Sequence, residues 1–310
     1  MIGGLHVSLS ALRHNAGLLR ELVGPKRAAF VVKGNAYGHG LVETALAIEP
    51  LAARICVYSA DEGIALRDGG ITAPVLVLGP IPADALDDVL AAGLELALWS
   101  TKEFARRLCT AARNRHVTAA AHIKVNTDLN RLGFEPHELV DVIEEFLHLP
   151  EIEIAGIFSH LASAEEIDSP YTMHQLSSFE RALAQAKPLL DQRALTPLHH
   201  IAASAAAMLW PQTRLDMARF GIALYGLWPS PQTRAAMGTQ ALDLQPALSY
   251  RSEIIAVRRI PAGASVGYGG SFHAPREMPI GVVPAGYADG VPRALSNRGA
   301  FLVDGAVCPI

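Results

Sequence analysis

Short apolar runs alternate with longer amphipathic segments from the N-terminus to about Tyr225. The run Ala28 to Val32 is continuously apolar and partly β-branched, which is typical of a strand buried on both faces. Leu12, Ala16 and Leu19 recur at helical spacing instead and predict an amphipathic helix. The same criteria predict strands at residues 28–32, 55–58, 75–78, 95–99, 119–125, 154–158, 198–201 and 220–224, and helices at residues 11–22, 40–48, 61–67, 83–91, 101–112, 136–147, 173–190 and 204–209.

This alternation indicates parallel β/α units. About eight strands in this length are what a closed (β/α)8 TIM barrel needs, so we predict an α/β fold of that class. A doubly wound open sheet is the structural competitor. It should carry a Gly-x-Gly-x-x-Gly pattern after its first strand, and the glycines from Gly34 to Gly40 do not fit that spacing.

The pattern changes after Gly226. Trp228-Pro229-Ser230-Pro231 is a turn-rich linker, and beyond it residues 247–257, 278–283 and 300–307 are predicted as strands separated by Pro and Gly turns. We therefore expect a barrel domain at residues 1–232 and a mostly β domain at 233–310. A first strand at residues 5–9 can join the β domain. Because the sequence stops in what looks like a hairpin, we expect that domain to be incomplete.

Composition and net charge exclude some classes of function. The chain has 310 residues, is 50% hydrophobic and carries a formal net charge of -4, which argues for a globular protein and against a nucleic-acid surface. Its cysteines, Cys56, Cys109 and Cys308, are far apart and lack metal-ligand spacing, so we expect no metal and a reducing, cytoplasmic location. No run approaches the roughly 18 apolar residues of a membrane span.

Candidate chemistry lies where the predicted strands end, the position of functional side chains in this fold. Lys33 ends the first barrel strand, and a desolvated lysine has the lowered pKa of a Schiff-base nucleophile. A lysine that only extends into water is the competing interpretation. His160 and His200 can equally be core histidines, Ser204 a helix cap and Arg219 a structural ion pair. Their shared position on one barrel face favours a site.

An anion fits part of this face. Ser204 opens a helix with free backbone N–H groups, and Gly221-Ile222 allows a close backbone approach. A phosphate cradle near the last strands together with a strand-end lysine suggests pyridoxal phosphate, carried by Lys33.

Several motifs resemble alanine racemase, the fold-type III pyridoxal-phosphate family. The segments concerned run along the whole chain and are Val31-Val32-Lys33-Gly34-Asn35-Ala36-Tyr37-Gly38-His39-Gly40, residues 126–134, Phe158-Ser159-His160, Ala203-Ser204, Arg219-Phe220-Gly221-Ile222-Ala223-Leu224-Tyr225-Gly226, Val266-Gly267-Tyr268-Gly269 and Pro284-Ala285-Gly286-Tyr287-Ala288-Asp289-Gly290.

The resemblance implies roles. Lys33 and Tyr268 match the two catalytic bases, on the D and L faces of the substrate. The phosphate binders match Tyr37, Ser204, Gly221 and Ile222. Arg219, backed by His160, matches the residue that faces the pyridine nitrogen. Arg131 matches the arginine near the phenolic oxygen of the cofactor. Lys124 matches the lysine that is often carbamylated to hold that arginine, and Tyr287 matches a residue that lines the substrate entry.

The implied function is racemisation of L- and D-alanine, which supplies D-alanine for peptidoglycan. The implied partners are an amino-acid substrate and a second copy of the chain, in a head-to-tail homodimer with shared sites. Two alternatives stay open at this point. One is a cofactor-binding homologue with impaired catalysis, because the family's chain continues beyond Ile310. The other is a racemase for another small amino acid such as serine.

Overall fold

The computed structural model describes residues 3–99 and 102–310. The chain forms two compact units. The larger comprises Ser8–Ala247, and the smaller combines Leu248–Ile310 with the N-terminal strand that ends at Val7.

The larger unit is built on an eight-stranded parallel sheet with the order β8-β7-β6-β5-β4-β3-β2-β9. Past β8, Ala203 bridges Arg219, whose backbone N–H donates to the Ala202 carbonyl at 3.0 Å, so the two sheet edges meet and the barrel nearly closes. The predicted (β/α)8 architecture is confirmed. Its strands are β2 (Ala28–Val31), β3 (Arg54–Val57), β4 (Val75–Val77), β5 (Glu95–Leu98), β6 (Ala119–Lys124), β7 (Ile152–Phe158), β8 (Leu198–His200) and β9 (Ala218–Phe220).

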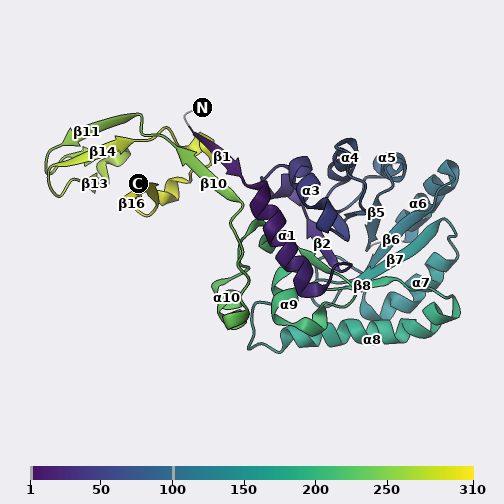
Figure 1. The fold of residues 1–310 in the computed structure, drawn as a ribbon. Coiled ribbons are helices and arrows are strands. Elements are labelled where there is room, and N and C mark those ends of the chain that lie inside the picture. The colour runs from purple at the N-terminus through teal and green to yellow at the C-terminus, as the bar shows by residue number, and fades with distance from the viewer. Residues whose placement is uncertain (1–2, 100–101) are drawn as a thin grey trace. The chain divides into compact units, whose positions relative to one another are not determined.

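Helices lie outside these strands (Figure 1). The α-helices are α1 (Leu9–Val23), α2 (Lys33–Tyr37), α3 (Leu41–Ile48), α4 (Ala60–Asp68), α5 (Leu86–Ala91), α6 (Lys102–Arg115), α7 (Leu139–Leu147), α8 (Tyr171–Gln192), α9 (Ser204–Leu209) and α10 (Pro231–Met237). Short 3-10 helices are η1 (Glu49–Leu51), η2 (Ala83–Ala85), η3 (Pro136–Glu138), η4 (Pro211–Thr213), η5 (Ile222–Tyr225), η6 (Gly238–Gln240), η7 (Tyr268–Gly270), η8 (Tyr287–Asp289) and η9 (Arg293–Leu295). None of the helices in the described part of the chain has the length and apolarity to cross a membrane.

The core explains the apolar composition of β2. All four of its residues are buried, and Phe30 has no exposed surface. Full burial of one such aromatic side chain contributes roughly 1.5–3 kcal/mol, so an uninterrupted apolar strand is stable only between two covered faces. The prediction of a strand buried on both faces is confirmed.

In the barrel, a local prediction was wrong at the edge of the site. The strand predicted at residues 220–224 ends at Phe220, and η5 follows it, because Gly221 turns the chain out of the sheet. The helix predicted at residues 61–67 is confirmed as α4. It begins one residue earlier, at Ala60, because the Ser59 hydroxyl accepts from the Glu62 N–H and Glu62 reaches back in a capping box.

The smaller unit consists of antiparallel two-stranded sheets. Its pairs are β1 (Gly3–Val7) with β10 (Leu248–Ser252), β11 (Ala256–Ile260) with β14 (Met278–Val282), β12 (Ser265–Val266) with β13 (Phe272–His273), and β15 (Ala300–Val303) with β16 (Ala306–Pro309). Within its described residues, Ala274 is the one buried apolar side chain. This unit therefore has almost no core of its own.

Candidate active site

The carboxyl ends of the barrel strands surround a cavity of about 700 Å³. Nine of the predicted site residues line it: Lys33, Tyr37, Lys124, Arg131, His160, Ser204, Arg219, Gly221 and Ile222. Lys124 and Arg219 lie in β6 and β9, and the other seven lie in the segments that follow β2, β6, β7, β8 and β9. The fold thus brings together residues that are spread over nearly 190 positions, because parallel strands present their carboxyl ends at one face.

Lys33 opens a left-handed turn. Gly34, Asn35, Ala36 and Tyr37 have φ values of 63°, 53°, 54° and 52°. Such a conformation costs an L-residue with a Cβ roughly 1–2 kcal/mol, so other contacts must hold it. Glu62 provides them, because its Oε1 accepts from the Gly34 N–H at 2.6 Å and the Asn35 N–H at 3.3 Å. Lys33 is half-buried, with Nζ 5.9 Å from the centre of the Tyr58 ring.

Arg219 is held rigidly in the barrel. Its side chain is buried, and Nη2 donates to the Ser159 carbonyl at 2.8 Å and to the Ile201 carbonyl at 3.3 Å. Burial lowers the pKa of Arg219 to about 10, which leaves the guanidinium charged at neutral pH. Burial, followed by the charge of Arg219, lowers the pKa of His160 to about 3. The imidazole is therefore neutral, and its Nδ1 lies 3.3 Å from Arg219 Nη2, where it can accept.

The cavity is electropositive. Lys33, Lys124, Arg131 and Arg219 line it, against the single carboxylate of Glu165 among the described lining residues. Burial, and then the charges of Arg131, Arg219 and Lys33, lower the pKa of Lys124 to about 8. An anionic ligand would relieve this repulsion, since charges of one sign in a partly desolvated cavity raise each other's free energy.

One wall of the cavity has the form of an anion cradle. The Ser204 hydroxyl accepts from the Gly221 backbone N–H at 3.2 Å. A Cβ built at Gly221 would lie 3.2 Å from the Tyr37 hydroxyl, so a side chain there would fill the space between backbone and phenol. Burial, and then Cys56, raises the pKa of Tyr37, which keeps its hydroxyl protonated as a donor. The set of hydroxyl donors, lysine and arginine fits a phosphorylated aldehyde cofactor such as pyridoxal phosphate.

Arg131 lies in the loop after β6, which Asn126 organises. The Asn126 amide donates to Asn130 Oδ1 and to Glu135 Oε1, both at 2.9 Å, and its Oδ1 accepts from the Asn130 N–H at 2.9 Å. These bonds close the loop on itself, so the backbone that carries Arg131 is fixed next to Lys124.

Tyr268 and Tyr287 belong to the smaller unit. Each begins a short 3-10 helix, η7 and η8, and their side chains are 93% and 67% exposed. Among the described residues, neither tyrosine therefore has a side-chain partner that would define its role.

Three polar residues that support the site were not predicted from the sequence: Glu62, Glu95 and His122. Glu62 could have been found from the Ser-x-x-Glu spacing of a capping box. Glu95 and His122 carry no such signal. They lie within predicted strands, where a polar residue normally suggests a solvent-facing position.

Comparison with known proteins identifies relatives along the whole chain. Residues 7–229 match the family described as "Alanine racemase, N-terminal domain", and residues 247–310 match "Alanine racemase, C-terminal domain". An alanine racemase of Symbiobacterium thermophilum is 39% identical over 306 residues, which cover 98% of this chain and 78% of the relative. One from Desulforamulus reducens is 38% identical over 302 residues, covering 96% of this chain and 80% of the relative.

Solved structures give the same result for the fold. The alanine racemase from the D-cycloserine producing Streptomyces lavendulae superposes with a TM-score of 0.90 at 31% identity, covering 99% of this chain and 80% of that one. The alanine racemase from Bacillus anthracis, solved with bound L-Ala-P, superposes with a TM-score of 0.86 at 30% identity. This match covers 99% of this chain and 78% of that one. The sequence matches and these superpositions span both units, and the chain therefore belongs to the alanine racemase family.

Proposed function

We propose that this protein interconverts L-alanine and D-alanine with pyridoxal phosphate and so supplies D-alanine for peptidoglycan. The observation that carries the proposal is the single cavity in which a strand-end lysine, a buried arginine and an anion cradle meet. Membership of the alanine racemase family supports it. So do solved relatives that hold amino-acid-like ligands, one with L-Ala-P and one, from Clostridium difficile, in complex with cycloserine.

The cavity residues fit the cofactor in the following way. Lys33 would carry it, and its phosphate would lie against the cradle formed by Tyr37, Ser204, Gly221 and Ile222. Arg219 would face the pyridine nitrogen. When bound, the cofactor supplies a conjugated system that delocalises the negative charge left on the α carbon when its proton is removed. Because a guanidinium donates and cannot accept, Arg219 would keep that nitrogen unprotonated and would favour simple reprotonation of the α carbon.

Inversion at the α carbon requires a base on each face of the substrate. We assign Lys33 Nζ to the D face and Tyr268 Oη to the L face, so that one removes the α proton from its own face and the other donates a proton on the opposite face. Tyr287 is assigned to the substrate entry. In this scheme the barrel domain holds the cofactor and the first base, and the β domain expected from residue 233 onward supplies the second.

Lys124 is proposed to be carbamylated. This modification joins the neutral amine to carbon dioxide, forming a C–N bond and releasing a proton, and a pKa of about 8 leaves a substantial neutral fraction at neutral pH. The product would replace one of four neighbouring cations by an anion that Arg131 can bind. Labelling with ¹³C-bicarbonate and carbon NMR checks it, and no labelled carbamate in wild type beyond a Lys124→Ala variant would contradict it.

We also propose a head-to-tail homodimer with shared sites, which the exposure of Tyr268 supports. A tyrosine that is 93% exposed lacks the shielded surroundings that a general base needs, and a second copy of the chain would provide them. Mixing inactive Lys33→Ala and Tyr268→Phe proteins should restore part of the activity through one intact composite site per heterodimer. The absence of any rescue would contradict sharing. The free state of Cys56, Cys109 and Cys308 agrees with the cytoplasmic location that we propose.

The decisive experiment is incubation of the full chain with L-alanine and pyridoxal phosphate in D2O. We expect D-alanine to accumulate and deuterium to enter the α position. Bound cofactor without either product would contradict the proposal and favour a cofactor-binding protein without racemase activity. Comparison of kcat/KM for L-alanine and L-serine then establishes which small amino acid is the substrate.

A further inference from the structure

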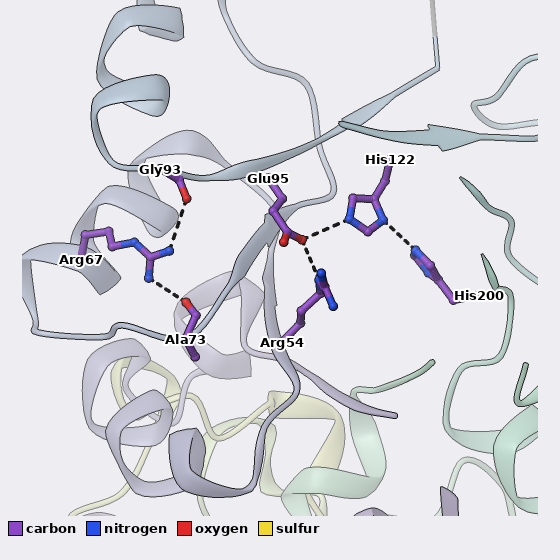
Figure 2. A network of polar contacts seen from close by, with 7 residues as sticks. All are labelled: Arg54, Arg67, Ala73, Gly93, Glu95, His122 and His200. Atoms are coloured by element: carbon purple, nitrogen blue, oxygen red, sulfur yellow. Dashed lines mark hydrogen bonds and ion pairs between the residues drawn. The ribbon is translucent and has the colours of Figure 1, made fainter. Parts of the chain in front are cut away.

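A line of polar side chains, buried from Arg219 to His122 and partly buried at Glu95 and Arg54, connects residues of five barrel strands. Arg219 Nη1 lies 2.5 Å from His200 Nδ1, His200 Nε2 lies 3.0 Å from His122 Nδ1, and His122 Nε2 lies 3.1 Å from Glu95 Oε2. Arg54 Nε closes the line at 2.7 Å from the same Glu95 oxygen. Figure 2 shows four members of the line, Arg54, Glu95, His122 and His200, with the His122 ring between Glu95 and His200.

The surroundings of His122 show that the backbone is adapted to this line. His122 and His200 have no exposed surface. His122 pairs with Gly156 of β7 at an irregularity in the β6–β7 register, and a side chain at position 156 would collide with the His122 ring. The small residue therefore leaves the space that the imidazole needs to reach His200.

The protons in this line have one consistent arrangement. Burial opposes ionisation of Glu95, but hydrogen bonds from His122 and Arg54 prevail and lower its pKa to about 2. A carboxylate can only accept, so His122 Nε2 must carry a proton. Burial lowers the pKa of His122, which leaves the ring neutral and Nδ1 free to accept from His200 Nε2. Burial, and then Arg219, lowers the pKa of His200, so its Nδ1 in turn accepts from Arg219.

The opposite arrangement is excluded by chemistry. A guanidinium has no acceptor, so a proton on His200 Nδ1 would place two N–H groups against each other across 2.5 Å. The carboxylate of Glu95 fixes the direction at one end and the guanidinium of Arg219 fixes it at the other. All three hydrogen bonds from Arg219 to Glu95 then run the same way, which strengthens each of them.

We propose that Glu95, His122 and His200 form a positioning chain that fixes the orientation of the charged Arg219 guanidinium toward the cavity. The inference rests on the proposed function, in which Arg219 faces the pyridine nitrogen. A rotated guanidinium would leave that nitrogen without its donor, so the chain would act on cofactor chemistry through Arg219 without touching the cofactor. A purely structural role for the same residues would affect stability alone.

The first test reads the tautomers directly. The full chain with ¹⁵N-labelled histidine is studied by long-range ¹H–¹⁵N NMR, with and without pyridoxal phosphate. We expect both His122 and His200 as neutral Nε2–H tautomers in both samples. A charged His200, or a proton on its Nδ1, would overturn the proposal.

The second test uses variants. In Glu95→Leu the His122 N–H loses its acceptor, so mixed tautomers, a changed visible absorbance of bound pyridoxal phosphate and a roughly 10- to 100-fold lower kcat are expected with little change in KM. Glu95→Gln keeps an acceptor oxygen and should restore the Nε2–H tautomers and most of kcat. Glu151→Leu removes the partner of Arg113, 2.6 Å away in another ion pair of the barrel unit, and is the matched control that leaves tautomers and absorbance unchanged.

The outcomes separate this proposal from the proposed function. Lower thermal stability of Glu95→Leu with unaltered tautomers and absorbance would overturn the positioning chain, whether or not the protein racemises alanine. Absence of racemisation with the expected tautomers would overturn the function and leave the hydrogen-bond direction established. If Glu95→Leu does not fold, the tautomers of the wild type and of Glu95→Gln decide. Loss of the Nε2–H tautomers in Glu95→Gln would contradict the positioning chain, whereas Nε2–H tautomers in both proteins would support it.

Discussion

The two units treat their candidate residues in opposite ways. In the barrel, Arg219 is buried and bonded to two carbonyl groups, and Glu62 holds the turn that carries Lys33. In the smaller unit, Tyr268 and Tyr287 are exposed on short helices between two-stranded sheets that bury almost no apolar surface. The difference teaches that the cofactor half of the proposed site is preorganised by the barrel, whereas the half with the second base is not organised by its own unit.

The largest effect is expected at the preorganised half. Lys33→Ala should remove cofactor attachment and one base together, so that racemisation falls by at least about 10⁴-fold. The visible absorbance of bound pyridoxal phosphate should disappear as well. Lys187→Ala, which removes an exposed ion pair with Asp191 on α8, is the matched control. Cofactor absorbance and activity within tenfold of wild type would show that Lys33 is not the attachment point.

Tyr268→Phe tests the half that is not preorganised. We expect activity to fall by about 10²–10⁴-fold because one base is lost, while cofactor absorbance persists. Exchange of the α proton with D2O should continue from D-alanine and stop from L-alanine, as measured by NMR. Tyr250→Phe in the same unit is the control. Equal exchange from both enantiomers would contradict the assignment of Tyr268 to the L face.

Gly221→Ala tests whether the open space at Gly221 is needed for anion binding in the cradle. The added Cβ would come within 3.2 Å of the Tyr37 hydroxyl, so the space for a phosphate shrinks and the phenol must move. We expect roughly tenfold weaker binding of pyridoxal phosphate, measured by equilibrium titration, because one charge-assisted hydrogen bond is weakened. Gly17→Ala, on the open face of α1, should leave that affinity unchanged. An unaltered affinity in Gly221→Ala would place the phosphate elsewhere.

A prediction of a different kind concerns the acid stability of the barrel. His122, His160 and His200 have pKa values below their ordinary value of 6.5, with His160 at about 3. Between pH 6.5 and 3 these histidines bind protons in the unfolded chain but stay neutral in the folded chain, so the free energy of unfolding should fall as the pH falls. The slope is up to about 1.4 kcal/mol per pH unit for each histidine.

Glu95 adds a second step to this profile. Its folded pKa of about 2 lies below the ordinary value of 4.5, so its contribution is complete above pH 4.5 and is lost from there down to pH 2. Urea unfolding at a series of pH values checks both steps. His160→Gln should reduce the slope between pH 6.5 and 5, and a free energy independent of pH in that range would refute the account.

Local sequence sufficed for most of the fold. Apolar runs such as Ala28 to Val32 and helical periodicity such as Leu12, Ala16 and Leu19 are properties of neighbours along the chain, so they predict strands and helices directly. The strand predicted at 220–224 was wrong because apolar composition alone cannot separate a strand from the 3-10 turn that Gly221 starts. The nine residues that line the cavity were expected to lie together because the carboxyl ends of parallel barrel strands share one face.

By itself, then, the sequence determined the barrel class, the family and the residues at the strand ends. Tertiary structure decided how those residues are held: Glu62 on the left-handed turn, and the line from Glu95 to Arg219. His122 and His200 are 78 positions apart, and nothing local relates them. Hydrogen-bond direction and pKa depend on distance, burial and charge in space, and only the folded chain fixes these for groups that are remote in sequence.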